Sequence, residues 1–383
     1  MASQLRMLCN MMQKKPKIGV LGRSGGNPKR GKVLINLGRM LKDDFELDLI
    51  INSRKVNPEL EKYYNIVNYS SLKINKSDYI KLLINDKLNL FRYIRRNEPD
   101  LIFQYTHPFV QGPVVAVIGK ITGTPTITRF SGSSFEMHKT SRGLKAKISA
   151  YFNFKLFMKL MFWADRVIVL GESQKREAVA NGCNLKKIIV LPQPIDEKKF
   201  HPPKSRAAAR KRLGFEADKK YVLWVGNLKK YKGLETLTSA IRNVNSRSDE
   251  FYFYIIGKDY ENISEKLKKL GSNVKVVGEV LHKDMVKYYQ AADLLIHTSF
   301  VEASVPNTIW EAAACGTPSI GRDIRDTRKI ADVTFGNDDE LADLILNGKW
   351  KFSKKSKVPM EYAWVKLKEK YKKTFKELCR LHR

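Results

Sequence analysis

The sequence is poor in the residues and segments that build several common classes of protein. Its 383 residues hold four cysteines, which are scattered and form neither a Cys-x-x-Cys pair nor a cluster with histidines. This excludes a disulfide framework and a zinc site of the usual spacing, and it predicts reduced thiols. No apolar run approaches the roughly 20 residues that a membrane-spanning helix needs. The function classes that depend on those features are therefore set aside.

Acidic residues are also scarce relative to basic ones. The chain carries 71 Lys and Arg against 39 Asp and Glu, a formal net charge of +32. Such a charge attracts anionic lipid, nucleic acid or phosphorylated substrates. A nucleic-acid-binding protein is therefore one alternative, but the sequence contains no recognised binding module or base-stacking motif. We expect no nucleic-acid partner.

The chain is long enough for two domains, since one core of this size is uncommon. Buried-strand runs alternate with helical patterns in both halves, which predicts α/β architecture with parallel, doubly wound sheets. Residues 1–16 are expected to be a leader, disordered or interfacial, and too interrupted for a signal peptide. We place a first domain at 17–195 and a second at 196–358, with the Pro-rich segment 188–203 as the linker. Residues 359–383 are predicted to form a basic helix that can cross back to the first domain.

The most informative stretch runs from Thr298 to Ile320, TSFVEASVPNTIWEAAACGTPSI. A loop that opens directly into a helix presents unpaired backbone N–H groups and the positive end of the helix dipole, and so binds anions. Glu302 and Glu311 flank the turn and could hold hydroxyl groups. Phosphate and hydroxyls together point to a sugar nucleotide.

This stretch resembles the motif of family 4 retaining glycosyltransferases (glycosyl transferases group 1), which reads E-G-F-P-N-x-x-x-E-A-x-A-C-G-T-P-V. The resemblance is close from Pro306 to Pro318, whereas eight residues separate the two glutamates and the family usually has seven. It implies the GT-B fold, with two Rossmann-like domains facing a central cleft. It also implies that Pro306, Asn307 and Thr308 lie at the donor diphosphate.

The same resemblance gives each glutamate a role. Glu311 is expected at the ribose hydroxyls, and Glu302 is expected to orient the donor sugar as a catalytic residue. The segment VGNLKKYKG, Val225–Gly233, is similar to the family's V-G-R-x-x-x-x-K-G, which clamps the diphosphate. Lys232 occupies the family's Lys position, while Asn227 stands where the family has Arg.

Loops after predicted strands of the first half supply the remaining candidates. Gly25 and Gly26 allow close approach of the backbone to a ligand. His107 and Ser131 follow two further strands, at the ends where doubly wound sheets bind ligands. We name His107 and Ser131 as catalytic candidates. The alternatives are that the glycines form a plain strand-to-helix turn and that His107 is a structural residue.

A helix is predicted over roughly Gly143–Ala164. From Met137 to Ala164 there are six Lys or Arg and no acid, interleaved with aromatic residues. This composition is typical of an interfacial helix at an anionic membrane, although a crossover helix packed on the sheet is compatible with it. We expect a lipid-linked or surface-glycan acceptor and a cytoplasmic protein held peripherally on the inner face of the membrane.

The resulting hypothesis is an enzyme that moves a sugar from a nucleotide-diphosphate donor with retention of configuration. No cofactor or bound metal is expected, since an Asp-x-Asp motif is absent at a matching place. Two other readings remain open. One is a non-catalytic or divergent GT-B protein that binds sugar nucleotides, and the other is a sugar-nucleotide epimerase on the same fold.

Overall fold

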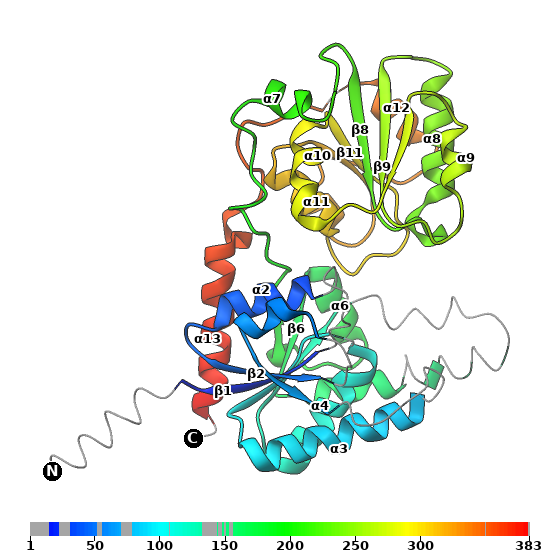
Figure 1. Ribbon diagram of the computed structural model, residues 1–383. Coiled ribbons are helices and arrows are strands. Elements are labelled where there is room, and N and C mark those ends of the chain that lie inside the picture. Colours follow the sequence, from blue (N-terminus) through cyan, green and yellow to red (C-terminus); the bar gives the residue numbers. More distant parts are fainter. Residues whose placement is uncertain are drawn as a thin grey trace. The chain divides into compact units, whose positions relative to one another are not determined.

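The computed structural model describes residues 15–22, 31–51, 56–69, 79–106, 108–131, 144, 148, 151–152, 156–348 and 350–381. The described chain divides into two compact units. The described residues up to 170, from 174 to 191 and from 367 onward form one unit, and the described residues within 171–173 and 192–366 form the other. Each unit is built around one parallel sheet (Figure 1), so the predicted α/β class is confirmed.

The sheet of the first unit has seven strands in the order β3-β2-β1-β4-β5-β6-β7. All six strand pairings are parallel. The strands are β1 (Lys17–Leu21), β2 (Glu46–Ile51), β3 (Asn65–Asn68), β4 (Leu101–Gln104), β5 (Thr126–Phe130), β6 (Arg166–Val169) and β7 (Ile188–Val190). The connecting α-helices are α2 (Lys32–Leu41), α3 (Tyr79–Asn97), α4 (Pro108–Thr122) and α6 (Glu172–Ala180).

The last helix, α13 (Trp364–Leu381), returns to the first unit from residue 367 onward. Its Phe375 packs edge-on against Phe45 and Phe103, with ring centroids 6.0 and 5.0 Å apart. Lys372 and Lys376 each lie 2.7 Å from Asp44. Apolar packing and ion pairs therefore attach this basic helix, drawn red in Figure 1, to the sheet of the first unit.

Two local predictions for the first half are corrected. The expected α-helix of Gly143–Ala164 ends as a 3-10 helix, η4 (Phe157–Trp163). Met158 and Met161, three residues apart, are both fully buried, and a 3-10 helix aligns residues at that spacing. The expected linker also begins too early, because Ile188–Val190 pairs with β6 as the edge strand β7.

The sheet of the second unit has six parallel strands in the order β10-β9-β8-β11-β12-β13. They are β8 (Lys220–Val225), β9 (Phe251–Ile256), β10 (Val274–Gly278), β11 (Leu294–His297), β12 (Ser319–Arg322) and β13 (Val333–Phe335). Its α-helices are α7 (Arg206–Lys211), α8 (Leu234–Asn245), α9 (Ser264–Lys268), α10 (Met285–Ala291), α11 (Asn307–Ala314) and α12 (Glu340–Leu346).

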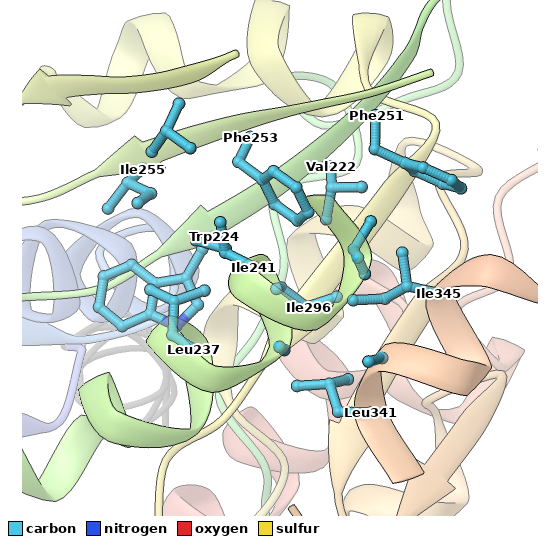
Figure 2. Close-up of a cluster of buried hydrophobic side chains, with 14 of the residues drawn as sticks. Val222, Trp224, Leu237, Ile241, Phe251, Phe253, Ile255, Ile296, Leu341 and Ile345 are labelled. Atoms are coloured by element: carbon cyan, nitrogen blue, oxygen red, sulfur yellow. The ribbon is translucent and has the colours of Figure 1, made fainter. Parts of the chain in front are cut away.

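Both faces of this second sheet are buried. Trp224, Phe253 and Ile296 pack on one face against residues of α8 and α12, as Figure 2 shows. Leu223 and Leu295 point to the other face, where α10 and α11 cover them. Alternate residues of each strand serve opposite faces, which is why the strands read as continuous apolar runs.

Candidate functional site

The carboxyl-end edge of the second sheet brings together the two segments that carry the sequence motifs. Neighbouring β8 and β11 are parallel, so the loops that follow them leave the sheet on the same side. Thr298 Oγ1 donates a hydrogen bond to Lys232 O at 2.8 Å, and Phe300 N donates to Tyr231 O at 2.9 Å. Trp224 Nε1 donates to Thr298 Oγ1 at 3.0 Å from within the core. The two loops are therefore held against each other.

Gly233 makes this contact possible. Its φ of +74° is left-handed, and a Cβ on it would lie 2.1 Å from Thr298 O. A side chain at this position would thus meet both a backbone penalty and a backbone atom. The glycine closes the turn after Lys232 and begins α8.

Lys232 and Glu302 form the centre of the edge. Lys232 Nζ lies 2.5 Å from Glu302 Oε1, and His297 Nε2 lies 3.2 Å from the same oxygen. Burial raises the pKa of Glu302, but the hydrogen bond from His297 and the charge of Lys232 outweigh it and hold that pKa at about 2. Glu302 is thus an ionised carboxylate with two donors on one oxygen.

His297 was missed by sequence reasoning. Its side chain is only 7% exposed, and its Nδ1 is buried without a hydrogen-bond partner among the described residues. The signal that could have found it is a histidine at the end of the apolar strand run LLIH. Its contact with Glu302 fixes the position of a glutamate whose spacing departs from the family motif.

Glu311 lies on α11, buried with 5% of its side chain exposed. Its Oε1 lies 2.7 Å from His282 Nε2, and its Oε2 accepts from Tyr289 OH at 2.9 Å. Burial raises the pKa of Tyr289 well above its usual range, and the nearby Glu311 raises it further. The phenol is therefore a donor to Glu311 at any ordinary pH. Neither His282 nor Tyr289 belongs to the motif that drew attention to this glutamate.

The start of α11 has the features of an anion-binding helix terminus. Pro306 is the N-cap, and the first intrahelical bond is donated by Ile309 N to Pro306 O at 3.1 Å. Asn307 and Thr308 precede that bond, so their N–H groups belong to the unsatisfied first turn. Thr308 Oγ1 is buried and has no hydrogen-bond partner among the described residues. Pro306 itself has no N–H, so its expected contact with an anion cannot be a backbone hydrogen bond.

Asn227 is exposed at the end of β8. Nearby, Lys229 Nζ lies 4.6 Å from the ring centroid of Tyr260, which is half exposed, and Lys230 is exposed. Lys229 is thus a cation close in sequence to the position where the family motif has an arginine.

A buried arginine, Arg322, holds the loop after β11 in place, and the sequence analysis did not identify it. Arg322 Nε donates to Thr298 O at 3.1 Å, and its NH2 donates to Thr236 Oγ1 at 2.8 Å and pairs with Asp338. Its guanidinium lies 4.0 Å from the ring centroid of Phe300. The loop after β11 is therefore anchored to α8 and to the segment before α12. A charged residue ending the short buried strand SIGR was the available signal.

The first-unit candidates are less well defined. His107, Gly25 and Gly26 lie outside the described residues. Ser131 directly follows β5 and is half-buried, next to the end of the strand. Two residues earlier, Arg129 is buried, with its guanidinium 4.6 Å from the ring centroid of Tyr105.

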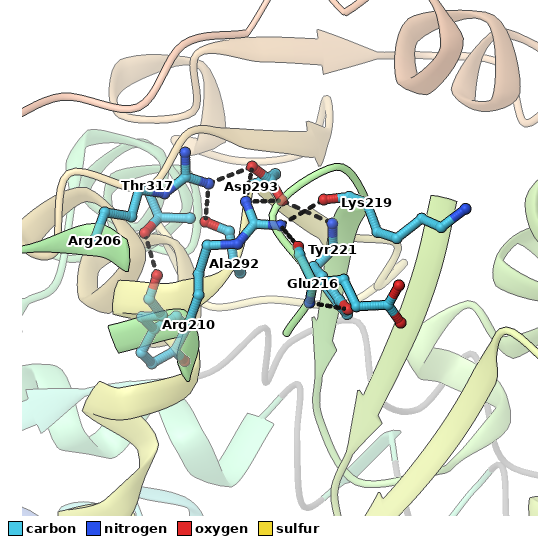
Figure 3. Close-up of polar contacts among 9 residues, drawn as sticks. Arg206, Arg210, Glu216, Lys219, Tyr221, Ala292, Asp293 and Thr317 are labelled. Carbon is cyan, nitrogen blue, oxygen red and sulfur yellow. Dashed lines mark hydrogen bonds and ion pairs between the residues drawn. The ribbon is translucent and has the colours of Figure 1, made fainter. Parts of the chain in front are cut away.

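The opposite edge of the second sheet carries a structural cluster (Figure 3). Asp293 pairs with Arg206 and with Arg210, the latter at 3.3 Å, and accepts from Tyr221 N at 2.8 Å. Asp293 precedes β11 and Tyr221 lies near the start of β8, so the cluster is at the amino-end edge. It attaches α7 to the sheet rather than contributing to the candidate site.

Over the part of the chain that the structure describes, no group of three or more His, Cys, Asp or Glu side chains could hold a metal ion. None of the helices described is both long and apolar enough to cross a bilayer.

Two family models match the chain in succession. Residues 31–199 match the model described as Glycosyltransferase Family 4, and residues 219–347 match Glycosyl transferases group 1. The chain belongs to this glycosyltransferase family. The resemblance of the sequence motifs to family 4 glycosyltransferases is thereby confirmed, and the two matches cover both halves of the chain.

Individual relatives agree with that assignment. The D-inositol 3-phosphate glycosyltransferase of Kineococcus radiotolerans is 27% identical over 171 residues, which is 41% of this chain and 39% of that protein. The chain thus spans about two fifths of the length of that curated relative. The sucrose-phosphate synthase of Thermosynechococcus elongatus has a similar structure, with a TM-score of 0.76 and 18% identity, covering 95% of this chain and 99% of that one.

The structure of Anabaena HepE in complex with UDP and glucose is a further match. Its TM-score is 0.68 at 18% identity, and the match covers 94% of this chain and 99% of the other. At these identities the likeness establishes the fold. The family 4 protein has the GT-B fold, as the motifs implied.

Proposed function

We propose that the protein transfers a sugar from a nucleotide-diphosphate sugar to an acceptor, with retention of anomeric configuration. The observation that carries this proposal is the grouping of Lys232, Glu302, Glu311 and the start of α11 at one sheet edge. Family membership and the complex of HepE with UDP and glucose support the choice of donor class.

The diphosphate would be held by the Lys232 ammonium and the N–H groups of Asn307 and Thr308. An ammonium group has three N–H donors, so Lys232 can retain its ion pair with Glu302 and also donate a hydrogen bond to a phosphate oxygen. Asn227 would add an amide donor. Stabilising the charge that develops on the leaving diphosphate is the largest contribution that such a site makes to catalysis.

The two carboxylates would bind the two remaining parts of the donor, the ribose and the transferred sugar. Glu311, on the helix, would accept from the ribose hydroxyls, and Glu302, beside Lys232, would orient the sugar. The family mechanism is transfer on the front face, in which the leaving phosphate oxygen assists removal of the acceptor proton. Such a mechanism does not demand a dedicated general base. His107 and Ser131, in the first unit, stay catalytic candidates.

The acceptor is proposed to be lipid-linked or a surface-glycan intermediate. Six apolar side chains of the segment 144–163 are 45–75% exposed, namely Leu144, Ile148, Tyr151, Phe152, Leu156 and Trp163. On an α-helix, residues with the sequence spacing of the first five would share one face. An exposed apolar face in a lysine-rich segment fits the surface of an anionic membrane on the cytoplasmic side.

Donor turnover tests the function directly. Purified protein is incubated with a panel of nucleotide sugars, with and without anionic liposomes carrying polyprenyl-phosphate-linked sugars. Release of nucleoside diphosphate and the anomeric configuration of the product are measured. We expect release with one donor class and a retained configuration. An inverted product would contradict the retaining assignment, and binding without any release would favour the second candidate.

That second candidate is a non-catalytic GT-B protein that binds sugar nucleotides. The exposed Asn227 in place of the family's arginine favours it, since an amide lacks both the charge and the bidentate geometry of a guanidinium. Restoring the cation distinguishes the two. Asn227→Arg would raise donor release in a weak transferase, and it would leave a binding protein inactive.

A further inference from the structure

The polar contacts of Glu311 continue to Lys199, which lies in the segment of the second unit before α7. Lys199 Nζ lies 2.9 Å from His282 Nδ1, and His282 Nε2 lies 2.7 Å from Glu311 Oε1. The ring of the fully buried Phe200 packs against the His282 ring, with centroids 5.0 Å apart. Lys199, His282 and Glu311 therefore form a continuous chain of polar contacts within the second unit.

The donor and acceptor roles in this chain follow from its two ends. An ammonium group can only donate, so His282 Nδ1 must accept from Lys199. The Nε2 atom then carries the proton and donates it in a hydrogen bond to Glu311. Lys199 thus selects the tautomer of His282 that presents a donor to the carboxylate. The ring packing against Phe200 keeps the imidazole in that orientation.

Tyr289 supplies the second donor, from α10. Its hydroxyl contacts Glu311 Oε2 at 2.9 Å, whereas His282 contacts Oε1. The terminal torsion of a glutamate is broad, so one donor leaves the carboxylate plane poorly defined. Two donors on different oxygens define that plane. Up to about four hydrogen bonds can be accepted by one carboxylate, of which His282 and Tyr289 provide two.

We propose that Lys199, His282 and Tyr289 are positioning residues that orient the Glu311 carboxylate for a vicinal pair of ribose hydroxyls. The proposal rests on the proposed function, because it takes Glu311 to bind the donor ribose. It adds three residues outside the family motif and a consequence for specificity. Discrimination between ribonucleotides and deoxyribonucleotides depends on these three residues, because only a correctly oriented Glu311 carboxylate accepts hydrogen bonds from both ribose hydroxyls.

Calorimetric titration of the full-length protein tests the proposal. The nucleoside diphosphate that binds wild type most tightly is compared with its 2′-deoxy and 3′-deoxy forms. We expect wild type to prefer the ribonucleotide by about tenfold or more, the value of one or two hydrogen bonds to a charged group. His282→Phe and Tyr289→Phe should each lower that preference by about three- to tenfold. Affinity for the deoxy forms should change less than about twofold in both variants.

Two further variants separate positioning from general packing. His282→Gln keeps a side-chain N–H close to the Nε2 position and should restore most of the preference that His282→Phe loses. Lys199→Met should weaken the preference, while Lys198→Met removes the same charge from an exposed neighbour and should not. If His282→Phe or Tyr289→Phe fails to fold, as thermal unfolding would reveal, the two lysine variants decide.

The outcomes distinguish this inference from the proposed function. A ribose preference that is equal in wild type, Lys199→Met and His282→Phe would overturn the inference and leave the donor assignment intact. Absence of a ribose preference in a wild type that binds nucleoside diphosphates would overturn the inference and the ribose role of Glu311, and it would leave the diphosphate assignment of Lys232 intact. Absence of binding by wild type to every nucleoside diphosphate would overturn the proposed function itself.

Discussion

Replacing Gly233 by alanine should disconnect the two loops of the donor site. The added Cβ would lie 2.1 Å from Thr298 O and 2.7 Å from Thr298 C, both of which are backbone atoms. Ordinary contact begins near 3.4 Å, so the loops must separate by about 1.3 Å, the difference between that value and 2.1 Å. A shift of this size breaks the hydrogen bond between Thr298 Oγ1 and Lys232 O.

The magnitude is the sum of a backbone and a contact contribution. Left-handed φ costs a residue with a Cβ about 1–2 kcal/mol. Loss of the Thr298–Lys232 and Phe300–Tyr231 hydrogen bonds adds about 1 kcal/mol each. We therefore expect Gly233→Ala to lower the free energy of unfolding by about 3–4 kcal/mol. Displacement of Lys232 should also reduce affinity for nucleoside diphosphates about tenfold.

Gly214→Ala is the matched control. Gly214 has nearly the same φ, +69°, but a Cβ there would meet nothing within 4 Å. It should cost only the backbone contribution of about 1–2 kcal/mol and leave nucleotide affinity unchanged. Urea unfolding and calorimetric titration measure the two effects. Equal stability losses in both variants, or an unchanged nucleotide affinity in Gly233→Ala, would refute the argument that this glycine joins the loops.

Three further predictions concern the same unit. Glu302 has a pKa held at about 2, below the usual 4.5, so its stabilising contribution is present above pH 4.5 and is lost as pH falls toward 2. Between pH 6 and pH 3, Glu302→Gln should therefore lose less stability than wild type, by about 2 kcal/mol in urea unfolding. Trp224→Phe removes the donor to Thr298 and should cost about 1–2 kcal/mol in the same assay at pH 7, whereas an unchanged stability would argue against that bond. Phe253→Ala opens a cavity in the core of Figure 2 and should cost about 3–5 kcal/mol, and a loss below 1 kcal/mol would mean that the cluster is loosely packed.

The alternating strands and helices were predictable because buried parallel strands leave a strong signal. YVLWV and FYFYII are continuous apolar runs that become β8 and β9, and such runs are typical of a sheet covered on both faces. The 3-10 geometry of Phe157–Trp163 was not predictable, because 3-10 and α periodicities differ little over seven residues. The short edge strand Ile188–Val190 was assigned to the linker because of the prolines that follow it in the sequence.

The candidate site was predictable only where motifs mark it. Lys232 and Glu311 stand at positions that the family motif labels, and Glu302 is displaced from its position by one residue. The structure brings Lys232 Nζ to 2.5 Å from Glu302 Oε1. The groups that orient them, such as His297 and His282, come from the end of a strand and from a separate 3-10 helix, η7 (His282–Asp284). Their proximity is a product of tertiary packing, which no local pattern records. The place of Pro306 at the diphosphate stays a prediction, and since proline lacks an N–H, a contact there cannot be a backbone N–H hydrogen bond.

The central claim is that this sheet edge binds the diphosphate of a sugar nucleotide through Lys232. Calorimetric titration of wild type, Lys232→Met and Lys230→Met with nucleoside diphosphates and monophosphates tests it most directly. Lys230 is the exposed neighbour and controls for net charge. We predict that wild type prefers the diphosphate, that Lys232→Met loses about tenfold or more of that affinity, and that Lys230→Met loses less than about threefold. A wild type that binds no nucleoside diphosphate, or equal losses in both lysine variants, would contradict the account.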